Sequence, residues 1–177
     1  MKEYVLRPVG GAVLFAALFV GATGCGGPEA FKVSEACGTK VDPELIGQLL
    51  PRGEELKTND TLSEPKQPRC EFEVDGKGQV GLRGDVVEPF VKPLEVNNWG
   101  MRRLGNPAPA DVGDGATVAD HGAMAVQACT YNGEKMQYVL SIDGVEDPKD
   151  TAERRRVLEK FLRSQLPVAM EAEGCRP

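Results

Sequence analysis

The chain has 177 residues, of which 41% are hydrophobic and 6% aromatic, and its formal net charge is −6 at pH 7. This length suits one domain with tails better than two complete domains. The acidic balance argues against nucleic acid as a partner, because phosphate binding needs clustered Lys and Arg. A single histidine, His121, excludes metal sites built from several histidines.

Residues 1–24 are expected to be an export signal. Lys2 and Arg7 precede an uncharged, apolar stretch over residues 9–20, and small residues follow. This order of a positive region, a short apolar region and a small-residue cleavage zone is typical of a secretory signal peptide. Because the apolar stretch is short for a hydrocarbon layer about 30 Å thick, an uncleaved transmembrane anchor is the lesser alternative.

The sequence Ala22-Thr23-Gly24-Cys25 resembles the lipobox of bacterial lipoproteins. The resemblance implies that Cys25 carries a diacylglycerol and becomes the first residue after cleavage. Two acyl chains anchor a protein stably where one binds only marginally, so the membrane is an expected partner through this lipid. The alternative is a cysteine that merely follows an ordinary cleavage site. Residues 25–34 would form the lipidated cysteine and a flexible tether, and residues 35–177 a single extracytoplasmic domain.

Four cysteines remain beyond Cys25, and an even number outside the cytoplasm indicates disulfides. Three connectivities are open. We favour Cys37–Cys70 and Cys129–Cys175, because each pair joins a helix-bearing segment to the strand nearest in sequence. The chain has no C-x-x-C spacing, which disfavours a metal or redox site. We predict no metal and no cofactor.

The first elements expected in the domain are a helix and a hairpin. Asp42 and Pro43 are typical of a helix start, and Pro51 ends the apolar pattern that follows. Residues 54–68 are polar, contain two prolines and are expected to form a loop. Cys70 to Val86 then alternates apolar and polar residues around a turn at 75–78, which predicts a β-hairpin.

The second half resembles the first, since Cys70-Glu71-Phe72 and Cys129-Thr130-Tyr131 are both Cys-x-aromatic motifs that enter a hairpin. A remote duplication is one explanation, and the common sequence pattern of hairpins is the other. Residues 94–104 are expected to hold a short helix or an irregular crossing, and 106–109 a loop. Short strands are expected at 116–119, 124–129 and 136–142. The last two flank Asn132-Gly133, a strong hairpin signal. A final helix begins at Asp147 or Asp150, carries an apolar stripe from Val157 to Leu166, and bends or ends at Pro167.

No catalytic group stands out. Asp111, Asp114 and Asp120 suggest a calcium loop, but the EF-hand spacing is missing and an Asp- and Gly-rich turn explains the segment. His121 could act as a base, although a solvated position in a turn is the favoured interpretation. We therefore predict that the protein is not an enzyme.

Two surface features have competing interpretations. Trp99 with Met101 is a candidate recognition patch, with burial in the core as the alternative. Arg154, Arg155 and Arg156 are expected to lie on a solvated helix face with i,i+4 ion pairs. Contact of these arginines with anionic lipid or a cell-wall polymer is the alternative.

Several short motifs together resemble actinobacterial cell-envelope lipoproteins of unknown function. These motifs are Cys37 before a Leu-rich helix, Cys70 opening a strand beside Phe72, and the turn Gly113-Asp114-Gly115 before the late hairpins. Related domains are the extracellular sensor portions of mycobacterial receptor kinases. The resemblance implies an α+β fold, with a curved antiparallel sheet of about five strands and helices on one face, and no established enzyme activity.

These observations predict a lipid-anchored binding or accessory module of the cell envelope. Its ligand or partner, an envelope protein, a polymer or a small molecule, is expected on the open sheet face or in the cleft between sheet and helices. A cell-wall hydrolase or other envelope enzyme is the first alternative, and a structural spacer or inhibitor-like domain the second.

Overall fold

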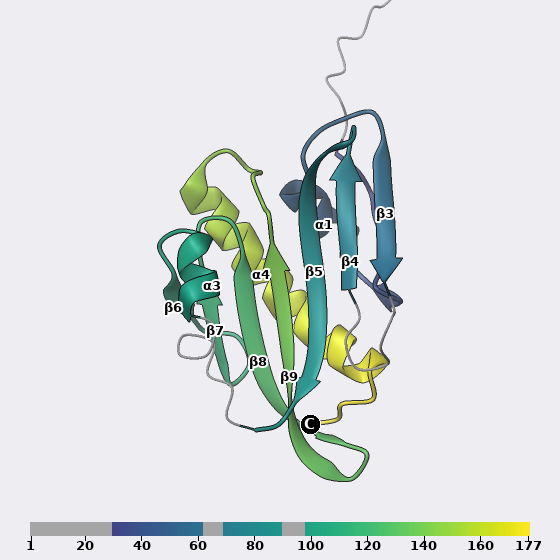
Figure 1. The fold of residues 1–177 in the computed structure, drawn as a ribbon, viewed down its shortest axis with the longest axis vertical. Helices are drawn as coiled ribbons and strands as arrows, with labels where there is room; N and C mark the ends of the chain where they lie inside the picture. Colours follow the sequence, from purple (N-terminus) through teal and green to yellow (C-terminus); the bar gives the residue numbers. More distant parts are fainter. Residues whose placement is uncertain (1–29, 62–68, 90–97) are drawn as a thin grey trace, which may run out of the picture.

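The computed structural model describes residues 30–61, 69–89 and 98–177, so the expected export signal and the first half of the tether, with Cys25, lie outside the described residues. The fold is α+β (Figure 1). The strands are β1 Glu35–Ala36, β2 Thr39–Lys40, β3 Leu56–Thr61, β4 Arg69–Val74, β5 Lys77–Val87, β6 Ala108–Ala110, β7 Gly115–Val118, β8 Ala123–Tyr131 and β9 Glu134–Asp143. The helices are α1 Pro43–Leu49, α3 Asn98–Arg103 and α4 Thr151–Ala172.

Seven strands form one antiparallel sheet in the order β3-β4-β5-β9-β8-β7-β6, and β1 pairs with β2 separately. The expectation of about five strands was wrong, because neither edge strand of the large sheet was predicted. β3 lies where a loop was expected, and its sequence, LKTNDT, has no alternating apolar face to reveal it. β6 has three residues with Pro109 at its centre, a residue that sheets tolerate at their edges.

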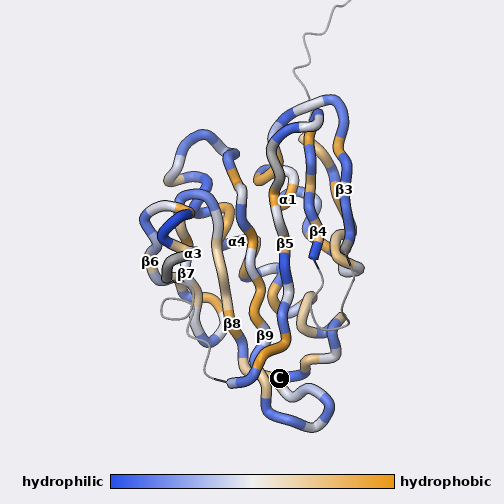
Figure 2. The backbone as a smooth tube through the Cα atoms, viewed as in Figure 1, coloured by the Kyte–Doolittle hydropathy of each residue, from blue (hydrophilic) through white to orange (hydrophobic). Residues whose placement is uncertain are grey.

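One face of the sheet packs against α1 and α4 and contains the main core. α4 crosses behind the sheet diagonally (Figure 1). Phe72 of β4, Tyr138 of β9 and Phe161 of α4 are almost completely buried there. Figure 2 shows that β3 is mainly hydrophilic, in agreement with its position at the edge of the sheet.

α3 corrects the expectation that the helices lie on one face. Its Met101 packs with Met124 and Val126 of β8 and Val139 of β9 in a second, smaller cluster. These strand residues alternate with Ala125 and Leu140, which belong to the main core. Because successive side chains of a strand point to opposite faces, α3 covers part of the face opposite α4.

The two longer helices begin as their sequences predict. Asp42 caps α1, and its Oδ1 accepts hydrogen bonds from the backbone N–H groups of Glu44 and Leu45 at 2.9 and 3.1 Å. Asp150, the second of the two candidates, caps α4. Pro167 does not end α4, which continues to Ala172. The exposed proline removes one backbone donor, while the buried residues on both sides of it hold the helix against the sheet.

Disulfides join Cys37 to Cys70 and Cys129 to Cys175, the two pairs that the sequence analysis favoured. The second disulfide ties the end of the chain to β8. Beyond it, Arg176 pairs with Thr130 through two backbone hydrogen bonds of 2.6 and 3.1 Å. Two disulfides are typical of a protein in an oxidising, extracytoplasmic compartment. Within the described ranges, no helix is both long and apolar enough to cross a membrane.

Candidate functional site

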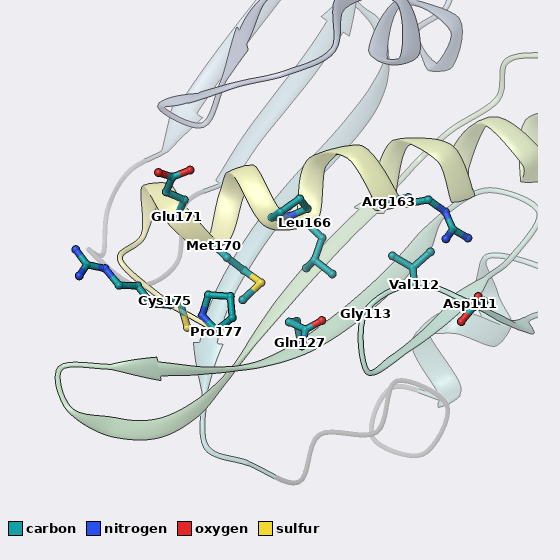
Figure 3. Close-up of a pocket in the computed structure, with 12 residues that line it drawn as sticks. Asp111, Val112, Gly113, Gln127, Arg163, Leu166, Met170, Glu171, Cys175 and Pro177 are labelled. Carbon is teal, nitrogen blue, oxygen red and sulfur yellow. The ribbon is translucent and has the colours of Figure 1, made fainter.

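A groove of about 830 Å³ opens between the C-terminal half of α4 and the outer part of β8 (Figure 3). Its volume lies in the range of small-molecule sites, about 300–1,000 Å³. The apolar lining residues are Val112, Leu166, Pro167, Met170 and Pro177, and Cys175 contributes its disulfide. The polar ones are Asp111, Gln127, Arg163, Glu171 and Arg176, with Gly113 beside them.

The groove exists because β7 is much shorter than β8. β7 pairs only with the segment Ala123–Val126, and β8 continues to Tyr131 without a neighbouring strand on that side. The segment 111–113 and the C-terminal tail pass at the two ends of this gap, and α4 lies above it (Figure 3). The floor of the groove is therefore sheet, and its wall is helix.

The uncovered edge of β8 is not open to another strand. Asp114 Oδ2 accepts a hydrogen bond from the backbone N–H of Ala128 at 2.6 Å. Thr130 is occupied by its two bonds with Arg176. A peptide that pairs with a sheet edge needs a row of free backbone N–H and C=O groups. The groove is therefore better suited to a ligand that is bound by side chains.

The lining combines an apolar centre with polar ends. Leu166 and Met170 project from α4 towards the sheet, and Arg163 and Asp111 lie at one end (Figure 3). Gln127 Nε2 donates to Asp114 Oδ1 at 3.1 Å, which fixes the amide and leaves its carbonyl oxygen available to accept from a ligand. Arg163 Nη2 lies 2.9 Å from Glu159 Oε1. This arrangement of an apolar body and few fixed polar groups is typical of small-molecule sites.

The aspartates of the suspected calcium loop have separate structural tasks. Asp114 caps the edge of β8. Asp120 binds the Asn106 amide at 2.6 Å and Arg155 Nη1 at 2.8 Å. Burial raises the pKa of Asp120, but these two hydrogen bonds and the charge of Arg155 lower it further, so the pKa lies below its ordinary value. Among the described residues, no cluster of His, Cys, Asp and Glu could hold a metal ion.

His121 connects two loops. Its Nδ1 lies 3.1 Å from the carbonyl oxygen of Val145 and 3.1 Å from Glu146 Oε1, and its side chain is 37% exposed. The backbone of Val145 also donates to the carbonyl of His121 at 3.0 Å. The contacts place His121 at the junction of the 120–122 turn and the β9–α4 connection, away from the groove-lining residues.

Arg154, Arg155 and Arg156 were expected to form a solvated helix face, and this expectation was wrong. Arg154 is 4% exposed, and its guanidinium donates to the carbonyls of Asp120, Glu146, Pro148 and Lys149 and to the Thr151 hydroxyl. Arg155 donates to the carbonyls of Asn106 and Val118. Both residues fasten loops to α4, so neither the solvated interpretation nor the lipid or polymer alternative holds for them. Arg156 alone is exposed.

The candidate recognition patch is not formed by Met101, which is 2% exposed and packs in the second cluster. Trp99 lies in α3, but its side chain is outside the described residues. The residues of the groove were missed by the sequence analysis, apart from the aspartate-rich turn and Cys175. Comparison with known protein families, with curated proteins and with solved structures finds no match.

Proposed function

We propose that this protein is a lipid-anchored extracytoplasmic binding module that holds a small, elongated and mainly apolar ligand in the α4–β8 groove. The observation that carries the proposal is the groove itself, with its apolar centre and polar ends. Two disulfides support the extracytoplasmic location. The lipid anchor rests on the lipobox-like sequence that ends at Cys25.

An apolar ligand is favoured over a polymer or an extended peptide. The edge of β8 is already satisfied by Asp114 and Arg176, so main-chain pairing with a peptide has no place there. Burial of apolar ligand surface against the groove's apolar lining, in which Pro167 and Pro177 are exposed, supplies the affinity, at about 25 cal/mol per Å² removed from water. The carbonyl oxygen of Gln127 and the guanidinium of Arg163 supply orientation.

Binding is tested with N-phenyl-1-naphthylamine, an apolar dye whose fluorescence rises when it leaves water. We expect saturable binding to the purified protein and at least tenfold weaker binding to Gln127→Phe, whose ring fills the floor of the groove. Lys160→Phe is the matched control, because it adds the same ring at an exposed position of α4 outside the groove. Equal affinity for the protein and both variants would contradict the proposal.

The lipid anchor is tested separately. Cells that produce the protein are labelled with radioactive palmitate, and the wild type is compared with Cys25→Ala. We expect label and membrane association only where Cys25 is present. An unlabelled wild-type protein recovered in the medium would overturn the anchor and leave the groove proposal intact.

A further inference from the structure

A second hollow lies on the opposite face of the sheet from α4, beside α3. It encloses about 330 Å³. Arg83 and Asp85 of β5 and Ser141 and Asp143 of β9 supply its polar lining, while Met101 of α3 and the following Leu104 contribute an apolar wall. Since it shares no lining residue with the α4–β8 groove, the inference goes beyond the proposed function and does not depend on it.

The strand register orders the charges of this hollow. Arg83 lies opposite Ser141, and Gly81 lies opposite Asp143. Asp85 is two residues from Arg83 and therefore on the same face of the sheet. The order along this face is Asp143, Arg83, Asp85, which is negative, positive, negative.

This order does not suit a hydrolytic pair of carboxylates. Asp143 and Asp85 lie in strand rows four residues apart, which corresponds to about 13 Å of backbone. Glycoside hydrolases hold their two carboxyl groups about 5–9.5 Å apart. Arg83 also stands between the two aspartates, so the three groups form a charged row suited to binding.

Gly81 brings the Asp143 carboxylate towards this row. A Cβ at position 81 would lie 2.8 Å from Asp143 Oδ1, so the carboxylate occupies the space that any other residue would take. Because Gly81 of β5 has no side chain, the Asp143 carboxylate of β9 can lie over β5.

The three charges line the hollow, and the charge of Arg83 acts on both aspartates to lower their pKa. Within the described ranges, the side chains of Arg83, Asp85 and Asp143 make no hydrogen bond and no ion pair within 4.0 Å. Burial raises the pKa of Asp85 by more than the charges of Arg83 and Arg69 lower it. Burial and the nearby charge of Glu71 raise the pKa of Asp143 by more than the charge of Arg83 lowers it. Asp85 is partly buried, whereas Arg83 and Asp143 are exposed at the rim, and charges that converge at a hollow are typical of a binding site.

We infer that this hollow binds a small basic amino acid, a ligand with one carboxylate, two ammonium groups and a net charge of +1. Arg83 holds the carboxylate through its planar pair of N–H donors. Asp85 and Asp143 accept from the ammonium groups, and the methylene chain packs against Leu104 and Val87, the partly buried apolar residues of the lining. The ligand's charge of +1 balances the net −1 of the three side chains, and the small volume favours a free amino acid over a polymer.

The test is calorimetric titration of the full chain with L-lysine. Cadaverine, which has both ammonium groups but no carboxylate, is the matched ligand. We expect saturable lysine binding and about tenfold weaker cadaverine binding, because the charge-assisted bond to Arg83 is lost. Arg83→Gln should abolish this difference, and Asp85→Asn should weaken lysine binding at least tenfold. Arg156→Gln, an exposed arginine on α4, should change neither affinity.

A second variant keeps every charge. Gly81→Ala displaces the Asp143 carboxylate, and it should weaken lysine binding severalfold while the unfolding transition stays cooperative. Gln127→Phe in the α4–β8 groove should leave lysine binding unchanged, which separates failure of this inference from failure of the proposed function. The inference is overturned if folded protein shows no saturable binding of lysine at millimolar concentration, if cadaverine binds as well as lysine, or if Asp85→Asn and Gly81→Ala leave the affinity unchanged.

Discussion

Gly113 occupies a position where a side chain has no room. Its φ is +59°, and a Cβ there would overlap the backbone carbonyl oxygen of Val126 and lie 2.9 Å from Leu166 Cδ2. The same carbonyl accepts the backbone N–H of Asp114 at 2.8 Å. Gly113→Ala therefore strains the backbone and pushes the 111–114 segment away from β8, at the end of the groove.

The cost of Gly113→Ala has two parts. A left-handed backbone costs an L-residue about 1–2 kcal/mol. Overlap with a well-packed backbone adds about 1–3 kcal/mol. We expect Gly113→Ala to lower the free energy of unfolding by about 2–5 kcal/mol.

Gly133 is the matched control for this substitution. Its φ is +84°, and nothing lies within 4 Å of a Cβ built on it. Gly133→Ala should cost only the backbone part, about 1–2 kcal/mol. The effect of alanine on the unfolded chain is the same in both variants, so the difference between them reports the overlap alone.

Urea unfolding followed by circular dichroism, with disulfides intact, measures this difference. We expect Gly113→Ala to be the less stable variant by about 1–3 kcal/mol. In thermal unfolding, each kcal/mol corresponds to about 2–4 °C for a chain of this size. Equal destabilisation by the two substitutions would refute the close approach of the 111–114 segment to β8.

Three further predictions concern buried polar groups. Thr117 is fully buried and its hydroxyl has no partner among the described residues, so Thr117→Val should raise the free energy of unfolding by about 1 kcal/mol; a lower melting temperature would contradict this. Arg154→Met should cost about 3 kcal/mol or more, since it orphans several carbonyls, whereas the exposed Arg156→Met should stay within about 0.5 kcal/mol in the same urea assay. The pKa of Asp120 is lower in the folded protein than in the unfolded chain, so the ionised carboxylate stabilises the fold at neutral pH. This contribution is lost as the pH falls from the unfolded value, about 4, to the lower folded value. Asp120→Asn should therefore lose less stability between pH 5 and pH 2, and an unchanged slope of urea midpoint against pH would count against the reasoning.

Local patterns predicted the elements whose signals are local. The cap at Asp42 marks the start of α1, and the Asn132-Gly133 turn joins β8 and β9 as expected. β3 escaped prediction because a polar edge strand has no apolar periodicity, and its identity comes only from pairing with β4.

The roles of the arginines and the groove depend on contacts distant in sequence. Arg154 resembles any exposed helical arginine in its local sequence, but one of its carbonyl partners, that of Asp120, lies 34 residues earlier in the chain. The groove follows from the difference in length between β7 and β8 and from the return of the C-terminal tail to Thr130. Neither the lengths of β7 and β8 nor the pairing of the C-terminal tail with Thr130 can be predicted from the sequence of one segment alone.

The central claim is that the α4–β8 groove is a ligand site. Its most direct test is a titration of isotope-labelled protein with N-phenyl-1-naphthylamine, followed by backbone amide chemical shifts. We expect the shifts to be largest at Val112, Gln127, Leu166 and Met170, which line the groove, and to saturate together. Shifts that are absent, or that are largest on another face of the sheet, would contradict the claim.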